Sequence, residues 1–449
     1  MILDLKHQHN SLFLYNSCMK VALVGYGIEG RSALTYWQDK GADVTICDQN
    51  SNIEVPPGVP IQLGEQYLDN LDRFDVIVRT VGMHPKVILE KNPGVQDKLT
   101  TNINEFLRVC PTKNIIGITG TKGKGTTSTL TVKMLEAAGK HAFLGGNYGI
   151  PALSFLPQLT PDSWVVLELS SFMLFDLTLS PHIAVCLMVA PEHLDWHDDA
   201  EDYFQAKANL FAHQNEQDIA IYFADNLTSH KIASHSPGRK ITYYANPGAY
   251  VEDDKIMIDQ TILCRTDELK LLGQHNWQNV CAAVTAVWQV SQSPDAIREV
   301  LTTFTGLTHR LEFVREIDGA AYYDDSFGTT PETAQVAVQA FPKQPIVLVL
   351  GGSDKGSSYD ALAQTVANAK MRKVVVIGAM AEKITQALNK AGYTDVVPGG
   401  NTMAEIVQIC HDNAKKGDVV LLSTACASFG MFKNYVDRGE QFKAAVHAL

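Results

Sequence analysis

The chain has 449 residues, of which 45% are hydrophobic and 19% are charged. This length corresponds to two to four domains, and the composition excludes a disordered chain and a coiled coil. The formal net charge of −12 disfavours general nucleic-acid binding, but it leaves room for a local cationic pocket that takes an anionic small molecule.

The eight cysteines are scattered and form no C-x-x-C pair, which favours a reducing compartment. The longest apolar stretch, residues 183–190, is far shorter than the roughly 20 residues that span a bilayer. Residues 1–18 fit neither a secretory signal nor a transit peptide, and they are compatible with an optional extension before Met19. These features predict a cytoplasmic protein without a transmembrane helix.

The first predicted segment is a βαβ unit. Its parts are a strand at 20–24, the turn Gly25-x-Gly27-x-x-Gly30, a helix to Lys40 and a second strand ending at Asp48. This is the dinucleotide fingerprint, in which the turn and the helix N-terminus receive phosphates. Alone, the pattern leaves open NAD, another nucleotide, or close helix packing. A strand at 75–79 and a helix at 105–110 complete the segment.

A second α/β domain begins near residue 114, with a strand at 114–118, a glycine-rich loop and a helix at 126–138. The loop Gly120-Thr-Lys-Gly-Lys124 lets backbone N–H groups converge on phosphate oxygens, and Lys124 can reach the β- and γ-phosphates. It departs from the general P-loop at Gly125, which lacks the hydroxyl that normally reaches Mg²⁺. Thr126 and Thr127 are the candidate substitutes.

Polar residues follow the next strands, at 164–168 and 183–189. Glu168 ends the first, where a carboxylate is placed to bind Mg²⁺. His193 and His197 follow the second strand. Because the H-E-x-x-H order of zinc enzymes is absent, we favour a magnesium site with one histidine over a zinc site. The remaining alternative is a polar loop without a ligand. Lys207 lies on an amphipathic helix, and its position alone predicts a solvent-exposed side chain.

The remaining chain continues the α/β alternation. A strand at 219–223 precedes a helix at 277–290, whose start carries two amides, Asn276 and Asn279, suited to a purine edge or to N-capping. Further strands are predicted at 321–324, 346–350, 374–377, 395–397 and 419–422. Helical segments separate them, so we expect a parallel sheet covered on both faces.

Taken in order, these segments resemble the Mur ligases over nearly the whole chain from Met19. The motifs that carry the resemblance are those at 120–124, 145–149, 167–172, 273–276, 304–310, 324–326 and 422–429, together with 432–435 and 438–439. The last group is most specific to the family members that add D-glutamate.

The resemblance implies an α/β fold of three domains. These are an N-terminal Rossmann-like domain for the UDP substrate (1–108), a central P-loop-type ATPase domain (109–308) and a C-terminal Rossmann-like domain for the amino acid (309–449). The implied activity is ATP-dependent, Mg²⁺-assisted addition of D-glutamate to UDP-N-acetylmuramoyl-L-alanine through an acyl phosphate, by a monomer with no nucleic-acid partner and no membrane insertion. The alternatives are a ligase for another amino acid such as L-glutamate, a folylpolyglutamate synthase-like ligase, a catalytically weakened nucleotide-binding protein and a nicotinamide oxidoreductase.

The resemblance also implies roles for individual residues. Catalysis is assigned to Lys124, Glu168, His193 and Lys207, the last as a carbamate, and metal binding to Thr126, Glu168, His193 and Lys207. ATP contacts are assigned to Gly120, Thr121, Lys122, Gly123, Lys124, Gly125, Thr126, Thr127, Asn276, Asn279, Arg310 and Asp325. UDP-substrate contacts are assigned to Gly25, Gly27, Ile28, Glu29, Gly30, Asp48, Asn147 and Ser170, and amino-acid contacts to Thr329, Lys355, Ser428 and Tyr435.

Several positions depart from the family pattern. Besides Gly125, Lys122 replaces an asparagine, Met173 replaces a glutamine and Tyr435 replaces a phenylalanine. Phe327-Gly328 replaces a lysine and an alanine, which removes a cation from the expected site. We nevertheless expect an active enzyme, because Glu168, His193 and Lys207 are all present.

Overall fold

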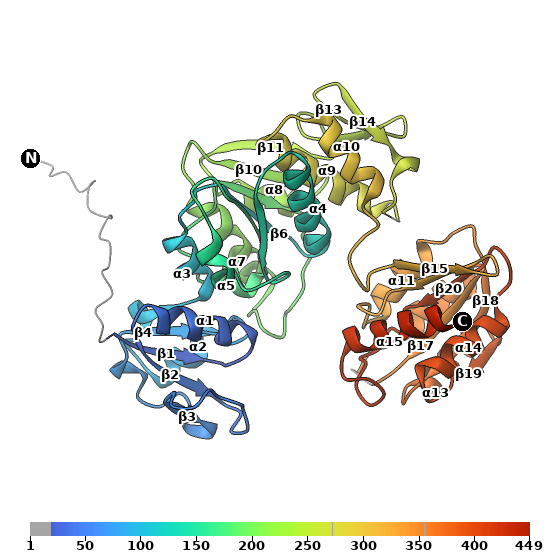
Figure 1. The fold of residues 1–449 in the computed structure, drawn as a ribbon, viewed down its shortest axis with the longest axis horizontal. Helices are drawn as coiled ribbons and strands as arrows, with labels where there is room; N and C mark the ends of the chain where they lie inside the picture. The colour runs from blue at the N-terminus through green and yellow to red at the C-terminus, as the bar shows by residue number, and fades with distance from the viewer. Residues whose placement is uncertain (1–18, 272, 354–355) are drawn as a thin grey trace, which may run out of the picture. The chain divides into compact units, whose positions relative to one another are not determined.

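The computed structural model describes residues 19–271, 273–353 and 356–449 (Figure 1). The chain forms two compact units: one runs up to Leu263 and includes Asn279–Ile297, and the other comprises Cys264–Gln278 and Arg298–Leu449. The predicted domain boundaries at 108/109 and 308/309 remain predictions. Within the described ranges no helix is both long and apolar enough to cross a membrane. The seven cysteines in those ranges form no disulfide bonds.

The first unit begins with a five-stranded parallel sheet of order β3-β2-β1-β4-β5. The strands are β1 (Lys20–Val24), β2 (Asp43–Asp48), β3 (Ile61–Leu63), β4 (Val76–Arg79) and β5 (Leu99–Thr100). The accompanying helices are α1 (Ile28–Asp39), α2 (Pro85–Lys91) and α3 (Asn102–Val109). This is the doubly wound strand order, in which ligands bind beyond the carboxyl ends of the strands.

A second parallel sheet in the same unit has the order β11-β10-β9-β6-β8-β7. Its strands are β6 (Ile115–Thr119), β7 (Ala142–Gly146), β8 (Trp164–Glu168), β9 (Ile183–Cys186), β10 (Ile219–Phe223) and β11 (Arg239–Tyr243). Its helices are α4 (Lys124–Ala137), α5 (Ala152–Phe155), α6 (Ser171–Leu174), α7 (Ala200–Ala212) and α8 (Leu227–Ala233). The interior strand β6 is fully buried, because helices cover both faces of the sheet.

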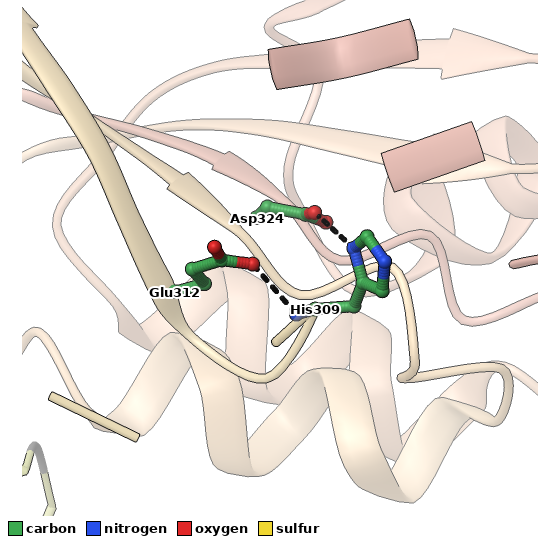
Figure 2. A group of neighbouring side chains, drawn as sticks. All are labelled: His309, Glu312 and Asp324. Atoms are coloured by element: carbon green, nitrogen blue, oxygen red, sulfur yellow. Dashed lines mark hydrogen bonds and ion pairs between the residues drawn. The ribbon is translucent and has the colours of Figure 1, made fainter. Parts of the chain in front are cut away.

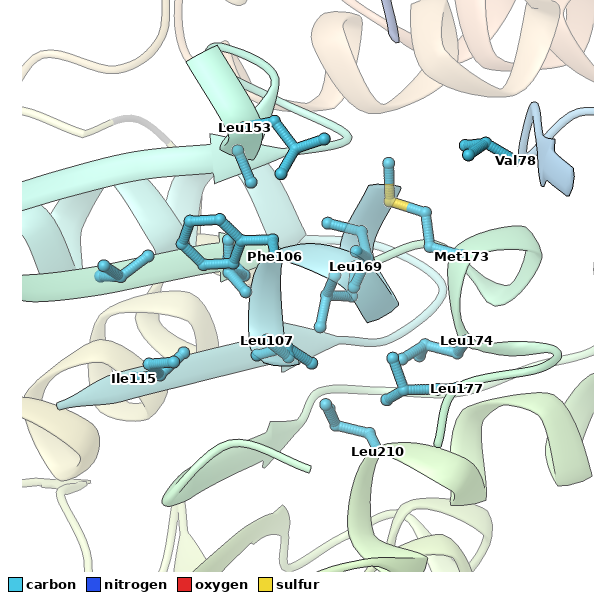
Figure 3. Packing of buried hydrophobic residues seen from close by; sticks show 14 of the residues in the cluster. Val78, Phe106, Leu107, Ile115, Leu153, Leu169, Met173, Leu174, Leu177 and Leu210 are labelled. Atoms are coloured by element: carbon cyan, nitrogen blue, oxygen red, sulfur yellow. The ribbon is translucent and has the colours of Figure 1, made fainter. Parts of the chain in front are cut away.

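One apolar core links these two sheets. It contains residues of β1 and α1 together with residues of α3, α5, α6 and α7. Figure 3 shows Phe106 of α3, Leu153 of α5 and Met173 of α6 in this cluster. Arg79, at the end of β4, adds a polar link, since its guanidinium pairs with Asp176 at 2.7 Å and donates to the carbonyl of Phe172. The first two sheets are therefore packed as one body.

A small three-stranded sheet and two helices follow. The strands are β12 (Tyr250–Glu252), β13 (Lys255–Ile258) and β14 (Thr261–Arg265), and the helices are α9 (His275–Trp288) and α10 (Pro294–Thr303). β12 and β13 pair antiparallel. The sequence patterns predicted α9 but not this sheet, because its strands are too short for a clear alternation.

The second unit contains a six-stranded sheet of order β15-β16-β20-β17-β18-β19. Its strands are β15 (Glu312–Ile317), β16 (Ala320–Asp324), β17 (Ile346–Gly351), β18 (Met371–Ile377), β19 (Val396–Pro398) and β20 (Val419–Leu422). Its helices are α11 (Pro331–Gln339), α12 (Asp360–Asn368), α13 (Ala381–Lys390), α14 (Met403–Asn413) and α15 (Tyr435–Ala448). Separate apolar clusters bury its two faces.

The prediction of a purely parallel C-terminal sheet is wrong at one edge. β15 pairs antiparallel with β16 through a tight turn at Asp318-Gly319. Three of the six residues of β15 are polar and three are exposed, as is common for an edge strand, so the sequence carries no hydrophobic run to reveal it. The predicted strands at 164–168, 219–223 and 419–422 match the structure, whereas β7, β11 and β15 were not predicted.

Candidate active site

Three candidate segments of the first unit follow three neighbouring strands. The glycine-rich loop follows β6, Glu168 ends β8, and the His193 segment follows β9. β6 lies between β8 and β9, and all three strands are parallel. Their carboxyl ends therefore meet at one edge of the sheet, which is the ligand-binding edge of open α/β sheets.

The glycine-rich loop has the backbone of a phosphate-binding turn. Gly120 and Gly123 have positive φ angles of 150° and 89°, and α4 begins directly after Gly123. The Lys124 ammonium folds back onto the loop, where it donates to the carbonyls of Gly120 at 3.0 Å and Thr121 at 3.1 Å. A loop of this shape at a helix N-terminus is suited to anionic oxygens.

Asn279 of α9 lies against this loop. A Cβ atom built at Gly123 would overlap the Asn279 side-chain oxygen, so the glycine is required by both its φ angle and its neighbour. The predicted amide of α9 is thus brought to the loop. Asn276, three residues earlier, is 6% exposed and belongs to the second unit.

Glu168 is a buried carboxylate, with 4% of its surface exposed. Asn147 holds it twice: its side-chain amide donates to Glu168 Oε1 at 2.8 Å and its backbone N–H donates to the Glu168 carbonyl at 2.8 Å. The asparagine predicted to touch the UDP substrate therefore also orients this carboxylate.

Lys207 is buried, at 1% exposure, and the solvent-exposed lysine predicted from the helix pattern is wrong. Its ammonium donates to the Gly120 carbonyl at 3.1 Å and lies 4.5 Å from the centre of the Tyr203 ring. Lys124 donates to the same carbonyl, so two ammonium groups share one acceptor. Desolvation, and then the charge of Lys124, lower the pKa of Lys207 to about 7.

The two histidines after β9 have different environments. His193 has a left-handed backbone, with φ at 59°, and its half-exposed ring lies 3.7 Å from Glu192. His197 is buried among aromatic rings, and its Nδ1 pairs with Asp202 at 2.8 Å. A hydrogen bond at Nδ1 leaves Nε2 able to bind a metal. Among the described residues, however, neither histidine belongs to a group of three potential metal ligands, which does not support a zinc site here.

The other loop residues are largely engaged with the protein. Thr121 Oγ1 bonds with the Ala190 carbonyl at 2.8 Å and Tyr203 OH at 2.9 Å. Lys122 is exposed and pairs with Glu192 at 2.6 Å, which offsets its additional charge. Thr126 and Thr127 are both buried on the first turn of α4, and Thr127 Oγ1 has no hydrogen-bond partner among the described residues.

The N-terminal glycine turn is built by close contacts. Gly25 has a φ of 98°, and a Cβ there would lie 2.5 Å from Thr80, while a Cβ at Gly30 would overlap the Gly25 carbonyl. Gly27, the N-cap of α1, faces open space. Its side of the turn therefore leaves room for another group to approach the backbone.

Polar neighbours hold this turn. Asp48 accepts hydrogen bonds from the backbone N–H groups of Tyr26 at 2.7 Å and Asn50 at 2.8 Å. Glu29 accepts from the Asn102 amide at 2.6 Å, and burial raises the Glu29 pKa.

Ile28 is 77% exposed. Ser170, another predicted contact, caps α6 by accepting from the Met173 N–H.

In the second unit, three side chains could in principle hold a metal: His309, Glu312 and Asp324 (Figure 2). His309 Nδ1 bonds with Asp324 at 2.6 Å, and the backbone N–H of His309 donates to Glu312 at 2.8 Å. The Lys443 ammonium lies 3.4 Å from Glu312, so this carboxylate is already paired with a positively charged side chain. We interpret the group as a clamp that holds the loop carrying Arg310.

Arg438, at 0% exposure, anchors the next loop of this unit. It donates to the Ser326 hydroxyl at 2.8 Å, the Ser326 carbonyl at 2.7 Å and the Cys426 carbonyl at 3.2 Å. The sequence analysis used Arg438 only as part of the motif at 438–439 and assigned it no role. A buried guanidinium with carbonyl partners holds two loops in one geometry.

The predicted amino-acid residues are only partly described. Ser428 is 5% exposed, and the Tyr435 ring lies edge-on to His309 and Phe327, with centroids at 6.1 and 5.2 Å. Thr329 lies in the loop after β16. Lys355 lies outside the described residues.

Asp325 gives this unit a pH dependence. It accepts from Ser423 Oγ at 2.6 Å and from the Leu311 N–H, and burial raises its pKa to about 7. Between its ordinary value near 4 and about 7, the folded protein keeps a proton that the unfolded chain has released. Raising the pH through this window therefore lowers stability.

We expect Asp325→Asn to remove this slope. The variant should be more stable than the parent at pH 8 and show little gain at pH 4, with about 1.4 kcal/mol for each unit of pKa shift. Thermal midpoints at both pH values check this, with Glu332→Gln, an exposed acid of α11, as the control. Identical pH slopes in the parent and Asp325→Asn would contradict it.

The fold and this site together define an α/β protein with a glycine-rich loop at a helix N-terminus, at the carboxyl edge of a parallel sheet. The Mur ligase middle domain profile matches residues 118–287, and the Mur ligase glutamate ligase domain profile matches residues 309–426. The chain is 36% identical to the UDP-N-acetylmuramoylalanine–D-glutamate ligase of Clostridium kluyveri, over 99% of this chain and 100% of that protein. It is 38% identical to the same-named enzyme of Symbiobacterium thermophilum, over 96% and 98%.

Solved structures agree in fold. The UDP-N-acetylmuramate–alanine ligase of Thermotoga maritima has a TM-score of 0.59 at 18% identity, covering 96% of this chain and 99% of that one. A MurF structure from Acinetobacter baumannii has a TM-score of 0.63 at 15% identity, covering 95% and 90%. The chain belongs to the Mur ligase family, and the predicted three-domain α/β fold class is confirmed.

Proposed function

We propose that this chain is an ATP-dependent ligase that joins D-glutamate to UDP-N-acetylmuramoyl-L-alanine in cytoplasmic peptidoglycan precursor synthesis. Relatives with that activity in their names match it over nearly its full length. The observation that carries the proposal is the arrangement of Lys124, Lys207 and Glu168 at the carboxyl ends of β6 and β8. The buried Lys207 ammonium and the half-buried Lys124 ammonium donate to the same carbonyl oxygen, so they concentrate positive charge beside the glycine-rich loop.

Phosphoryl transfer needs charge neutralisation and positioning more than acid–base chemistry. We propose that the Gly120–Gly125 backbone and Lys124 hold the ATP phosphates, with Asn279 fixing the loop. The alanyl carboxylate would take the γ-phosphoryl group, and the amine of D-glutamate would then displace phosphate from the acyl phosphate. ADP and phosphate are the products.

The residues fit a divalent cation. Glu168 supplies a buried carboxylate held in place by Asn147, Thr126 a hydroxyl and His193 a half-exposed ring nitrogen. Oxygen-rich donors of this kind suit Mg²⁺. When bound, the cation would neutralise phosphate charge. A carbamate on Lys207 would add two more oxygens and reverse the charge of that side chain.

The remaining substrates are assigned by unit. The turn from Gly25 to Gly30 would receive the diphosphate of the UDP substrate, because it has open space at Gly27 and lies at the α1 N-terminus. Ser428, Tyr435 and Thr329 of the second unit, with Lys355, are proposed for the amino acid, and Arg310, Asn276 and Asp325 for the nucleotide.

Phosphate release tests the proposal. We expect release from ATP only when UDP-N-acetylmuramoyl-L-alanine, Mg²⁺ and D-glutamate are all present. A reaction with L-glutamate instead would keep the chemistry and change the amino acid. Release with a folate acceptor, or tight NAD binding without binding of the UDP substrate, would overturn the proposal.

A further inference from the structure

Phe327 is a residue of the second unit that the proposed chemistry has not used. It occupies the position at which the family resemblance predicts a lysine. The guanidinium carbon of Arg310 lies 4.0 Å from the centre of its ring. The edge of the neighbouring Tyr435 ring meets it at a centroid distance of 5.2 Å and an interplanar angle of 83°.

The segment around Arg310 is held firmly in an unusual conformation. His309 and Leu311, on either side of Arg310, both have positive φ angles, of 62° and 45°. Non-glycine residues other than Asn and Asp rarely adopt this conformation, and strained residues of this kind cluster at functional sites. Here the contacts that hold it are the His309 clamp in Figure 2 and the bond from the Phe327 N–H to the His309 carbonyl at 2.9 Å.

The backbone on the N-terminal side of Phe327 is also held by hydrogen bonds. Its preceding residue, Ser326, is bound by the buried Arg438 and donates its hydroxyl to the Tyr435 carbonyl at 2.7 Å. These bonds hold the backbone directly before Phe327, and its ring contacts Arg310 and Tyr435. An aromatic face beneath a guanidinium attracts it and restricts its orientation.

We infer that Phe327 is a positioning residue that orients the Arg310 guanidinium for a nucleotide phosphate and couples it to Tyr435 in the proposed amino-acid pocket. This part of the second unit then has one oriented positive charge, that of Arg310, whereas the family pattern would have two, an arginine and a lysine. A lysine at this position would repel Arg310, whereas the aromatic face attracts it. The inference rests on the proposed function, because that proposal assigns Arg310 to the nucleotide.

Steady-state kinetics of the full chain test the inference. Phe327→Leu keeps apolar volume but removes the aromatic face, so we expect the ATP Michaelis constant to rise about tenfold, with that of the UDP substrate unchanged. Phe327→Trp should remain near the parent, and Phe327→Lys should be at least as impaired as Phe327→Leu. Thermal midpoints near that of the parent would show that the variants are folded.

A double-mutant cycle with Arg310→Gln separates the possible failures. We expect Phe327→Leu to have no further effect on ATP once Arg310 is replaced. An equal effect in both backgrounds, or equal activity of Phe327→Leu and Phe327→Trp, would overturn the inference. A change confined to the D-glutamate Michaelis constant would also overturn it, since Phe327 would then act on Tyr435 alone. If Arg310→Gln itself leaves ATP binding intact, the proposed nucleotide role of Arg310 fails instead.

Discussion

Replacing Lys207 by alanine is expected to abolish turnover, with a loss of about a thousandfold or more. The side chain is almost fully buried, and its ammonium shares the Gly120 carbonyl with Lys124. Two unit positive charges repel each other, by about 3 kcal/mol for a separation of about 5 Å and an effective dielectric constant of about 20. A carbamate would turn this repulsion into attraction, and the lowered pKa of Lys207, about 7, supplies the neutral amine that reacts with CO₂.

Two further variants distinguish a carbamate from a plain ammonium. Lys207→Arg keeps the positive charge but has no amine that forms a carbamate, so it should be as inactive as Lys207→Ala. Formate or acetate should partly restore Lys207→Ala, because a small carboxylate can occupy the vacated space. Lys133→Ala, which removes an exposed lysine of α4, is the matched control and should retain activity. Substantial activity in Lys207→Arg would rule out the carbamate.

Replacing Gly123 by alanine is expected to lower ATP affinity by about a hundredfold. A left-handed φ of 89° costs an alanine about 1–2 kcal/mol, and the new Cβ would in addition overlap the Asn279 side-chain oxygen. Either the loop or the amide must move, and in both cases the proposed phosphate cradle is distorted. Isothermal titration with ATP measures the effect.

Gly139 provides a matched control, because it is also left-handed, at φ 75°, but a Cβ there would meet nothing within 4 Å. Gly139→Ala should cost about 1 kcal/mol of stability and leave ATP affinity unchanged. If Gly123→Ala binds ATP like the parent, the loop does not hold the nucleotide. If both variants lose affinity equally, the loss comes from general destabilisation.

The Gly123 result depends on a contact that local sequence reports only in part. The glycine spacing of the loop predicted a phosphate-binding turn, and α9 was predicted with two amides at its start. That Asn279 lies against Gly123 required the fold, because the two residues are 156 positions apart in the sequence (279 − 123).

The sequence by itself determined the class of fold and the local elements. Apolar strands alternating with helices predicted α/β domains, and the loops after 119 and 24 were recognisable because glycine spacing is a local property of the chain. The edge strand β15 was not recognisable, because its side chains are half polar and its pairing partner is set by the neighbouring strand β16.

Only the tertiary structure decided the environments of individual side chains. The helix pattern predicts an exposed side chain for Lys207. The packing of α7 against the end of β6 instead buries it beside Gly120. By comparison with the family pattern, Phe327 is only the loss of a lysine. In the structure, the clamp at His309 and the contacts of Arg438 hold the segments that bring its ring against Arg310. Burial and pairing arise from segments distant in sequence, so no local pattern encodes them.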